Sequence, residues 1–307
     1  MKVSTPSGAD TPDPEYPEAL RGEHLLGFQR ALVAWYGPRA RPLRIRTTRE
    51  PWAILVSEVM AQQTQIARVD EAWVGFMRRY PTPGALAAAS TAEVLRAWAG
   101  LGYNRRALNL QRAAAAIEAD HEGRIPRSLE ELEALPGVGP YTARAVAAIA
   151  FGQPVAAVDT NVRRVVTRLI AHEPKPARLQ EVADALVDLA DPATWTHASM
   201  ELGATVCVAR APRCGECPLA AWCASAGQVE TPPRRRVTAE PAFDRTSRWL
   251  RGRIIERLRR LDDGAWETLP PAMGVHDGDD IEAAFTALQR EGMLERRPDG
   301  AVRLPSG

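Results

Sequence analysis

The stretch LPGVGPYTARAV, Leu135 to Val146, decides how this sequence folds. Gly137 and Gly139 permit backbone angles that other residues resist, and an apolar helical run follows them directly. A glycine turn at the start of a helix can present consecutive N–H groups, which together bind an anion such as a phosphate. The Lys-Ser or Lys-Thr pair of a nucleotide-binding P-loop is missing here, which excludes that kind of phosphate site. The alternative to an anion-binding turn is a plain turn between two helices.

The region around this turn, residues 20–189, is predicted to be helical. Its Ala- and Leu-rich segments have an apolar spacing near ~3.6 residues, and Pro/Gly stretches such as YPTPGAL and FGQP separate them. Two examples are PWAILVSEVMAQQTQIARVDEAWVGFMRRY and TAEVLRAWAGLGYNRRALNLQRAAAAIEADH. No convincing alternating strand pattern occurs in this region. We therefore expect a bundle of short packed helices.

The composition changes after Cys223. The polar, Pro- and Arg-rich stretch AGQVETPPRRRVTAEPAFDRTS predicts a linker. Beyond it, RGRIIERLRRL and DIEAAFTALQREGML each predict an amphipathic helix, and LERRPDGAVRL predicts two short strands around an Asp299-Gly300 turn. Helices followed by a hairpin of this size resemble a small winged-helix module with mixed α+β structure.

The bulk composition is that of an ordinary globular protein. The 307 residues are 45% apolar and 25% charged, with 39 basic against 38 acidic side chains. The near-zero net charge leaves any nucleic-acid partner to be found in local basic patches. No apolar run approaches the ~20 residues of a membrane span, and the N-terminus lacks the core of a signal peptide. We expect a cytoplasmic protein that does not contact membranes.

The four cysteines form one group, Cys207, Cys214, Cys217 and Cys223, and no other cysteine could pair with them. In a reducing compartment such clustering favours a metal site over disulfides. Four thiolates this close together can hold one tetrahedral zinc ion or an iron–sulfur cubane. Zinc ribbons usually have two Cys-x-x-Cys pairs and this sequence has one, at intervals of six, two and five residues, so both kinds of metal centre stay open at this point.

Together these motifs resemble the helix-hairpin-helix DNA glycosylase superfamily. LPGVGPYTA followed by AVDTNVRRV, the 6-2-5 cysteine spacing of the [4Fe–4S] loop, and SEVMAQQT at Ser57 to Thr64 are similar to the adenine-glycosylase branch. The resemblance covers residues 20–226. It implies an all-α fold with a six-helix barrel, an iron–sulfur cluster domain built from both flanks of it, and the small C-terminal module. It also implies double-stranded DNA with a mispaired or damaged base as partner, and we expect a monomer associated with the nucleoid.

The resemblance assigns roles to individual residues. Glu58 becomes the general acid, which burial should keep protonated near neutral pH, and Asp159 the carboxylate that stabilises a cation-like sugar. Asn161 and Tyr141 are expected to orient these two groups. Tyr141 replaces the lysine that attacks the sugar in bifunctional relatives, so the enzyme should release a base without cutting the strand. The expected DNA contacts are Gln62, Gln63, Thr64, Tyr103, Gly137, Val138, Gly139, Arg210 and Arg213.

The expected domain limits follow the same resemblance. They are a disordered 1–19, a cluster domain of 20–46 and 154–226, a barrel of 47–153, a linker of 227–247 and a module of 248–307. Two other activities stay open: a mismatch glycosylase for thymine or uracil opposite guanine, and a non-catalytic cluster-bearing DNA-binding protein. The base preference is open too. The C-terminal module is too small for the Nudix-like domain of many adenine glycosylases, and Ala61 and Asn104 replace a larger apolar residue and an aromatic.

Overall fold

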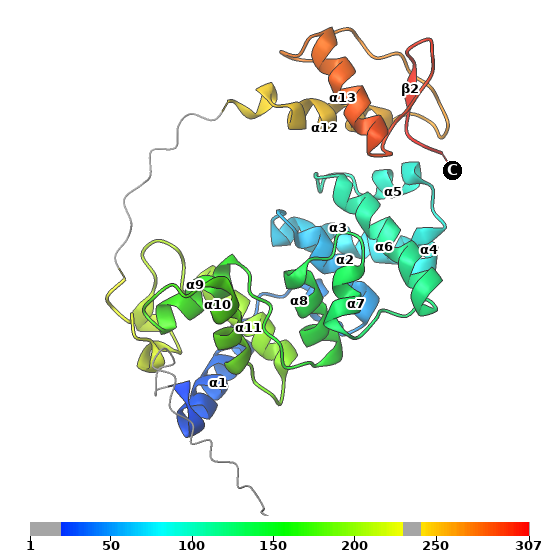
Figure 1. The fold of residues 1–307 in the computed structure, drawn as a ribbon. Coiled ribbons are helices and arrows are strands. Elements are labelled where there is room, and N and C mark those ends of the chain that lie inside the picture. Colours follow the sequence, from blue (N-terminus) through cyan, green and yellow to red (C-terminus); the bar gives the residue numbers. More distant parts are fainter. Residues whose placement is uncertain (1–19, 230–240, 307) are drawn as a thin grey trace, which may run out of the picture. The chain divides into compact units, whose positions relative to one another are not determined.

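The computed structural model describes residues 20–229 and 241–306, and the expected disordered N-terminus and most of the expected linker lie outside them. The described part is mainly helical, with one small sheet, as the sequence predicted (Figure 1). Its helices and strands are α1 Gly22–Tyr36, α2 Pro51–Ala61, α3 Ile66–Arg79, α4 Pro83–Ala87, α5 Thr91–Ala97, α6 Arg105–His121, α7 Leu129–Ala134, α8 Pro140–Phe151, α9 Thr160–Leu169, α10 Pro176–Ala185, α11 Pro192–Thr205, α12 Ser247–Leu258, α13 Gly278–Arg290, β1 Glu295–Arg296 and β2 Val302–Arg303.

The chain forms two compact units, each built from two separate stretches of sequence. Among the described residues, the first unit combines 20–41 with 152–229, and the second combines 42–151 with 241–306. Within the described residues, no helix is both long and apolar enough to cross a membrane.

The first unit packs α1 against α11, and α9 against both α10 and α11 (Figure 1). Its apolar core includes Phe28, Trp195 and Leu202. Two polar contacts fasten α1 and the residues after it to the distant part of this unit. Gln29 donates from its amide to the carbonyl oxygen of Val187 at 2.8 Å, and Arg41 forms a two-bonded ion pair with the buried Glu201.

The barrel part of the second unit contains α2 to α8. Each of the two long segments quoted above divides into two helices: α2 and α3 are separated by residues 62–65, and α5 and α6 by residues 98–104. Gln63 and Tyr103, one in each connection, have φ values of 57° and 45°. Left-handed backbone at a residue other than glycine costs free energy, and such positions concentrate at functional sites.

The helix-hairpin-helix consists of α7, the turn at residues 135–139 and α8. Gly137 has φ of +81°, and a Cβ atom there would lie 2.7 Å from the Cβ of Asn109 on α6. Glycine is therefore required at this position both for its backbone angle and for the close approach of the turn to α6. Pro140 begins α8, a position at which the missing N–H of proline is harmless.

The C-terminal module also belongs to the second unit. It contains α12, α13 and the antiparallel pair β1–β2, with Gly300 at φ +88° in the turn between the strands. A single bridge joins Glu267 to Val302 and extends this small sheet. Residues 243–245, which were expected to lie in the linker, form a 3₁₀ turn that packs on α12.

Candidate active site and metal centre

Glu58 lies on α2, where it is half-buried while residues 52–57, 59 and 60 of the same helix are buried. This helix packs against α8, which carries the half-buried Tyr141. Gln62 at the end of α2 donates from its amide to Thr142 Oγ1 at 3.3 Å and to the Gly137 carbonyl at 3.4 Å. The end of α2, one helical turn after Glu58, is thus hydrogen-bonded to the glycine turn and to the first turn of α8, beside Tyr141.

Asp159 belongs to the first unit and is the N-cap residue of α9. Its Oδ1 accepts hydrogen bonds from the backbone N–H groups of Asn161 and Val162, at 2.8 and 2.7 Å. Its Oδ2 accepts from the side-chain amide of Asn161 at 2.8 Å. Three donors therefore fix the orientation of this carboxylate, and the N-terminus of α9 adds a favourable helix dipole.

The side chain of Asn161 joins Asp159 to the cysteine loop. Its Oδ1 accepts from Arg164 Nη2 at 2.9 Å, and Arg164 Nε donates to the carbonyl oxygen of Cys207 at 2.7 Å. Arg164 Nη2 also donates to the carbonyl of Gly203 at 2.6 Å. Asn161 thus orients the carboxylate, and Arg164 ties Asn161 to the first residue of the loop.

All four cysteines line a single pocket and are half-buried. Burial raises the pKa of the Cys217 thiol to about 11, and the charges of the other three cysteines contribute to the rise. Burial also raises the pKa of Cys223. Two of the four thiols are thus costly to ionise, and four thiolates held together in one apolar pocket need a compensating cation, so this donor set fits a bound metal centre.

One arginine beside these sulfurs bears on the charge of the group that they hold. Arg168 contacts the same pocket, since its Nη1 donates to Cys207 Sγ at 3.3 Å and to the carbonyl of Val208 at 2.8 Å. The positive charge of Arg168 also suits an anionic group held by thiolates.

The predicted DNA contacts fall into two sets. Arg210 and Arg213 lie in the cysteine loop, where Arg213 bonds to the carbonyl of Thr205 and pairs with Glu216 at 3.5 Å. Arg210 is exposed, and no other described residue bonds to its side chain. Arg213 therefore helps to close the loop, while Arg210 is available to a ligand.

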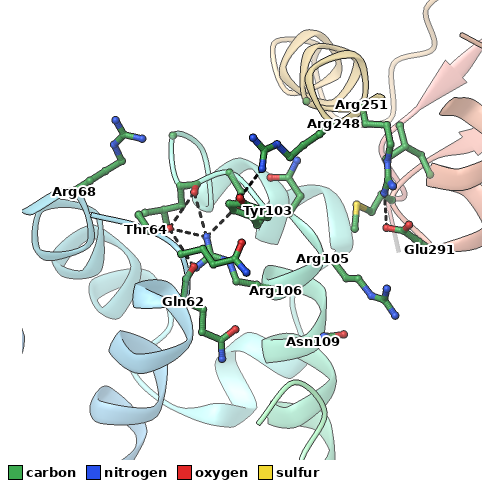
Figure 2. Close-up of a pocket in the computed structure, with 18 of the residues that line it drawn as sticks. Gln62, Thr64, Arg68, Tyr103, Arg105, Arg106, Asn109, Arg248, Arg251 and Glu291 are labelled. Carbon is green, nitrogen blue, oxygen red and sulfur yellow. Dashed lines mark hydrogen bonds and ion pairs between the residues drawn. The ribbon is translucent and has the colours of Figure 1, made fainter. Parts of the chain in front are cut away.

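The remaining predicted contacts belong to the second unit. Gln62, Gln63, Thr64 and Tyr103 line a groove of about 890 Å³ (Figure 2). Tyr103 is 42% exposed, whereas the hydroxyl of Thr64 accepts a hydrogen bond from Arg106 at 2.9 Å. In the glycine turn, Gly137 is exposed, Gly139 is half-buried and Val138 is buried.

The sequence motifs did not identify Arg106 as a residue of the site. It is 9% exposed, and its guanidinium donates to the carbonyl oxygens of residues 59, 60, 101 and 102. It therefore holds together the two loops that carry Gln62 and Tyr103 (Figure 2). Its position in the sequence could have indicated burial. Residues 106, 110, 113 and 117 have the spacing of one helix face, and the other three are apolar. Burial lowers the pKa of Arg106 to about 10.

Comparison with known proteins matches these features. A family model described as "HhH-GPD superfamily base excision DNA repair protein" matches residues 56–191, and one described as "Iron-sulfur binding domain of endonuclease III" matches residues 207–223. An adenine DNA glycosylase of Mycobacterium tuberculosis is 45% identical over 293 residues, which cover 89% of this chain and 92% of that protein. The human adenine DNA glycosylase is 42% identical over 67% of this chain and 40% of its own length.

Solved structures agree with the sequence matches. A thermostable thymine-DNA glycosylase has a TM-score of 0.62 at 28% identity, covering 65% of this chain and 95% of that one. An endonuclease III–DNA complex has a TM-score of 0.56 at 27% identity, covering 66% and 96%. The part of this chain outside the mycobacterial alignment is shorter than residues 248–307, so that similarity extends into the C-terminal module. The chain therefore belongs to the adenine DNA glycosylase family, and it is a base excision repair DNA glycosylase that binds DNA and carries a [4Fe–4S] cluster.

Proposed function

We propose that this protein removes adenine paired with 8-oxoguanine or guanine, by hydrolysing the bond between base and sugar. The name of its mycobacterial relative, with which it shares nearly its whole length, supports adenine as the target. The carboxylate geometry at Asp159 is the observation that carries the chemistry. A glycosylase needs a fixed negative charge beside the sugar, and three hydrogen bonds hold this one in place.

The reaction begins when the target nucleotide leaves the base stack, at a cost of a few kcal/mol. Glu58 then donates a proton to a ring nitrogen of the purine, which turns the base into a neutral leaving group. The sugar that remains resembles a cation, and the carboxylate of Asp159 stabilises it until water adds. Asn161 keeps Asp159 oriented, and Tyr141 is proposed to position the reacting groups from α8.

Tyr141 also limits the reaction to base removal. A bifunctional glycosylase uses a lysine amine at this position to attack the sugar and form a Schiff base, which leads to strand cleavage. A phenol cannot form that intermediate. The product is therefore an abasic site in an intact strand.

The proposed DNA contacts come from both units of the chain. The N–H groups of the turn at Gly137–Gly139 bind a phosphate, and Gln62, Gln63, Thr64 and Tyr103 hold the base left without a partner. Arg210 meets a phosphate, and Arg213 keeps the loop in the shape that presents Arg210. Cys207, Cys214, Cys217 and Cys223 hold the cluster, which supplies a structural centre that fixes the loop.

The test is single-turnover base release from a panel of duplexes. Adenine opposite 8-oxoguanine, guanine and cytosine should be compared with thymine and uracil opposite guanine, each analysed with and without alkali. We expect adenine release opposite the two purines and strand breaks only after alkali. Release of thymine and not adenine would refute the proposal and would match the thymine-DNA glycosylase to which the fold is similar.

Two substitutions test the roles of the carboxylates. Glu58→Gln keeps the shape but has no proton to give, so base release should fall by about 10²–10⁴-fold with little change in DNA affinity. Asp159→Asn removes the charge while keeping hydrogen-bonding groups, and it should cost about 10²–10³-fold. Near-normal turnover by Glu58→Gln would show that another group supplies the proton.

We further propose that the protein acts on DNA of the nucleoid as a monomer. Both carboxylates, the hairpin and all four cysteines come from one chain, so the proposed chemistry needs no second copy. Light scattering with and without a short duplex should give the mass of one chain, and of one chain per duplex. A dimer on the duplex would contradict this.

A further inference from the structure

The groove of about 890 Å³ in Figure 2 is lined by residues of both the barrel and the C-terminal module, which belong to the same compact unit. The loops after α2 and before α6 form one side. Phe243, Arg248, Arg251 and Met293 of the module form the other. The module therefore extends the surface that carries the proposed contacts to the unpaired base.

Specific contacts hold the module on the barrel. Arg259, next to the end of α12, donates to Asn104 Oδ1 at 2.7 Å. Arg96 pairs with Asp263 at 3.0 Å, and the N–H of Ala92 donates to the carbonyl of Pro305 at 2.9 Å. Asn104 is one of the two positions at which the sequence departs from the family pattern. Its role as acceptor for Arg259 gives that departure a physical reason.

The charge of the groove is strongly positive. Five arginines line it, and Glu291 is the one carboxylate among its lining residues. Arg106 is committed to backbone carbonyls, and Arg251 pairs with Glu291 at 2.6 Å. Among the residues that the structure describes, Arg68, Arg105 and Arg248 have no carboxylate partner. Three cations are thus available to an anionic ligand.

Aromatic faces lie beside one of these cations. The guanidinium carbon of Arg248 is 5.3 Å from the ring centre of Tyr103 and 4.9 Å from that of Phe243. Arg248 Nη1 also donates to the Tyr103 hydroxyl at 2.7 Å (Figure 2). Tyr103 is 42% and Phe243 is 56% exposed. Rings left this open to water offer faces on which a planar group can stack.

A ligand that suits this groove combines negative charge with planar rings, and an unpaired nucleotide of DNA has both. We propose that Arg248 and Phe243 complete the binding site for the strand opposite the excised base, with Arg248 determining the preference for the opposite nucleotide. This rests on the proposed function only in requiring that a base is flipped out. One helix and one turn of the module thereby add to the contacts that the barrel loops make with that strand.

The helix that faces the groove also distinguishes this module from a winged helix that reads DNA with its second helix. α12 places Arg248 and Arg251 in the groove, whereas α13 begins with Asp279 and Asp280 after the N-cap Asp277. Phosphates would be repelled at the start of α13. The basic α12 is therefore the DNA-facing element of the module.

The test compares Arg248→Ala with Arg253→Ala. Both remove one positive charge from α12, but Arg253 is exposed and does not line the groove. Fluorescence anisotropy on mismatched and fully paired duplexes, over a range of salt concentrations, gives the affinity and its salt dependence. Single-turnover base release at saturating protein gives the chemical step.

Arg248→Ala should bind the preferred mismatched duplex about 10-fold more weakly, the loss expected for one hydrogen bond from a charged group. Its salt dependence should fall by about 0.9 in slope, the value for one lost phosphate contact. Its discrimination between opposite bases should weaken, while the rate at saturation stays within about twofold of wild type. Arg253→Ala should match wild type in all four respects.

Equal behaviour of the two variants would overturn the proposal, and so would an Arg248→Ala defect confined to the rate at saturation. Circular dichroism and the visible absorbance of the cluster check folding. If Arg248→Ala does not fold, Arg248→Lys replaces it, and retained discrimination in that variant counts against the proposal. If wild type releases thymine instead of adenine, the proposed function fails, but the comparison on the duplex that it does process still decides the role of Arg248.

Discussion

Gly203→Ala tests how the proposed active site depends on packing between α9 and α11. Gly203 lies in α11, and a Cβ atom there would be 2.6 Å from the Cβ of Asn161 and 3.0 Å from its backbone carbon and oxygen. A backbone neighbour cannot rotate away as the end of a flexible side chain can. Alanine would therefore push the first turn of α9 away from α11, and with it the residue that orients Asp159.

The expected magnitude follows from two opposing effects. Replacing glycine by alanine inside a helix stabilises it by about 0.5–1 kcal/mol. Overpacking in a tight contact costs about 1–3 kcal/mol, and contact with backbone places this case in the upper part of that range. The net loss in free energy of unfolding should be about 1–2 kcal/mol. A displacement of about 1 Å at a catalytic group costs roughly 10²-fold in rate, so base release should fall by that order.

Gly75→Ala is the matched control. Gly75 lies inside α3, and a Cβ atom there would have nothing within 4 Å. Only the helix effect remains, so this variant should be about 0.5–1 kcal/mol more stable than wild type, with normal activity. Urea denaturation followed by circular dichroism, together with single-turnover base release, measures both effects. Normal stability and activity in Gly203→Ala would refute the idea that this contact positions Asp159.

Three further predictions concern the metal centre, the loops and the product. Purified protein should contain about four irons per chain with broad visible absorbance, and colourless protein with one zinc would contradict the cluster. Arg106→Lys cannot reach four carbonyls at once, so it should lose about 3 kcal/mol or more of stability and most DNA affinity; wild-type melting and binding would disprove its role in holding the loops. Borohydride should trap little covalent complex between wild type and DNA. Tyr141→Lys supplies the missing amine and should give more trapped complex. Strong trapping by wild type would overturn the assignment of base removal alone.

The helical fold could be predicted because its signals are local. Apolar spacing, Pro and Gly between segments, and the glycine turn each act over a few residues, and the structure confirms the helical class and the small C-terminal sheet. The roles of Glu58, Asp159 and the other site residues were available only through motifs read together. They stay predictions, because Glu58 and Asp159 belong to separate units of the chain.

The contacts that depend on distant residues could not be predicted. Nothing near Asn104 in the sequence indicates that Arg259 would donate to it across more than a hundred residues. Arg248 likewise lies in a helix with several arginines, and only its place beside Tyr103 separates it from Arg253. Such pairs are set by how the module packs on the barrel, which no local pattern records.

The interleaving of the two units sets an order of events during synthesis. The barrel segment, residues 42–151, leaves the ribosome as one continuous stretch and can begin to fold at once, because domains fold as units from the N-terminal side. α1 emerges earlier still, but its packing cannot be completed until residues 187–201 have been made, since Gln29 bonds to Val187 and Arg41 to Glu201. The four cysteines, residues 207–223, are made after the residues that α1 packs against. Interrupted translation before Val187 would therefore leave α1 without the residues that it packs against, and such a fragment is a substrate for chaperones and proteases.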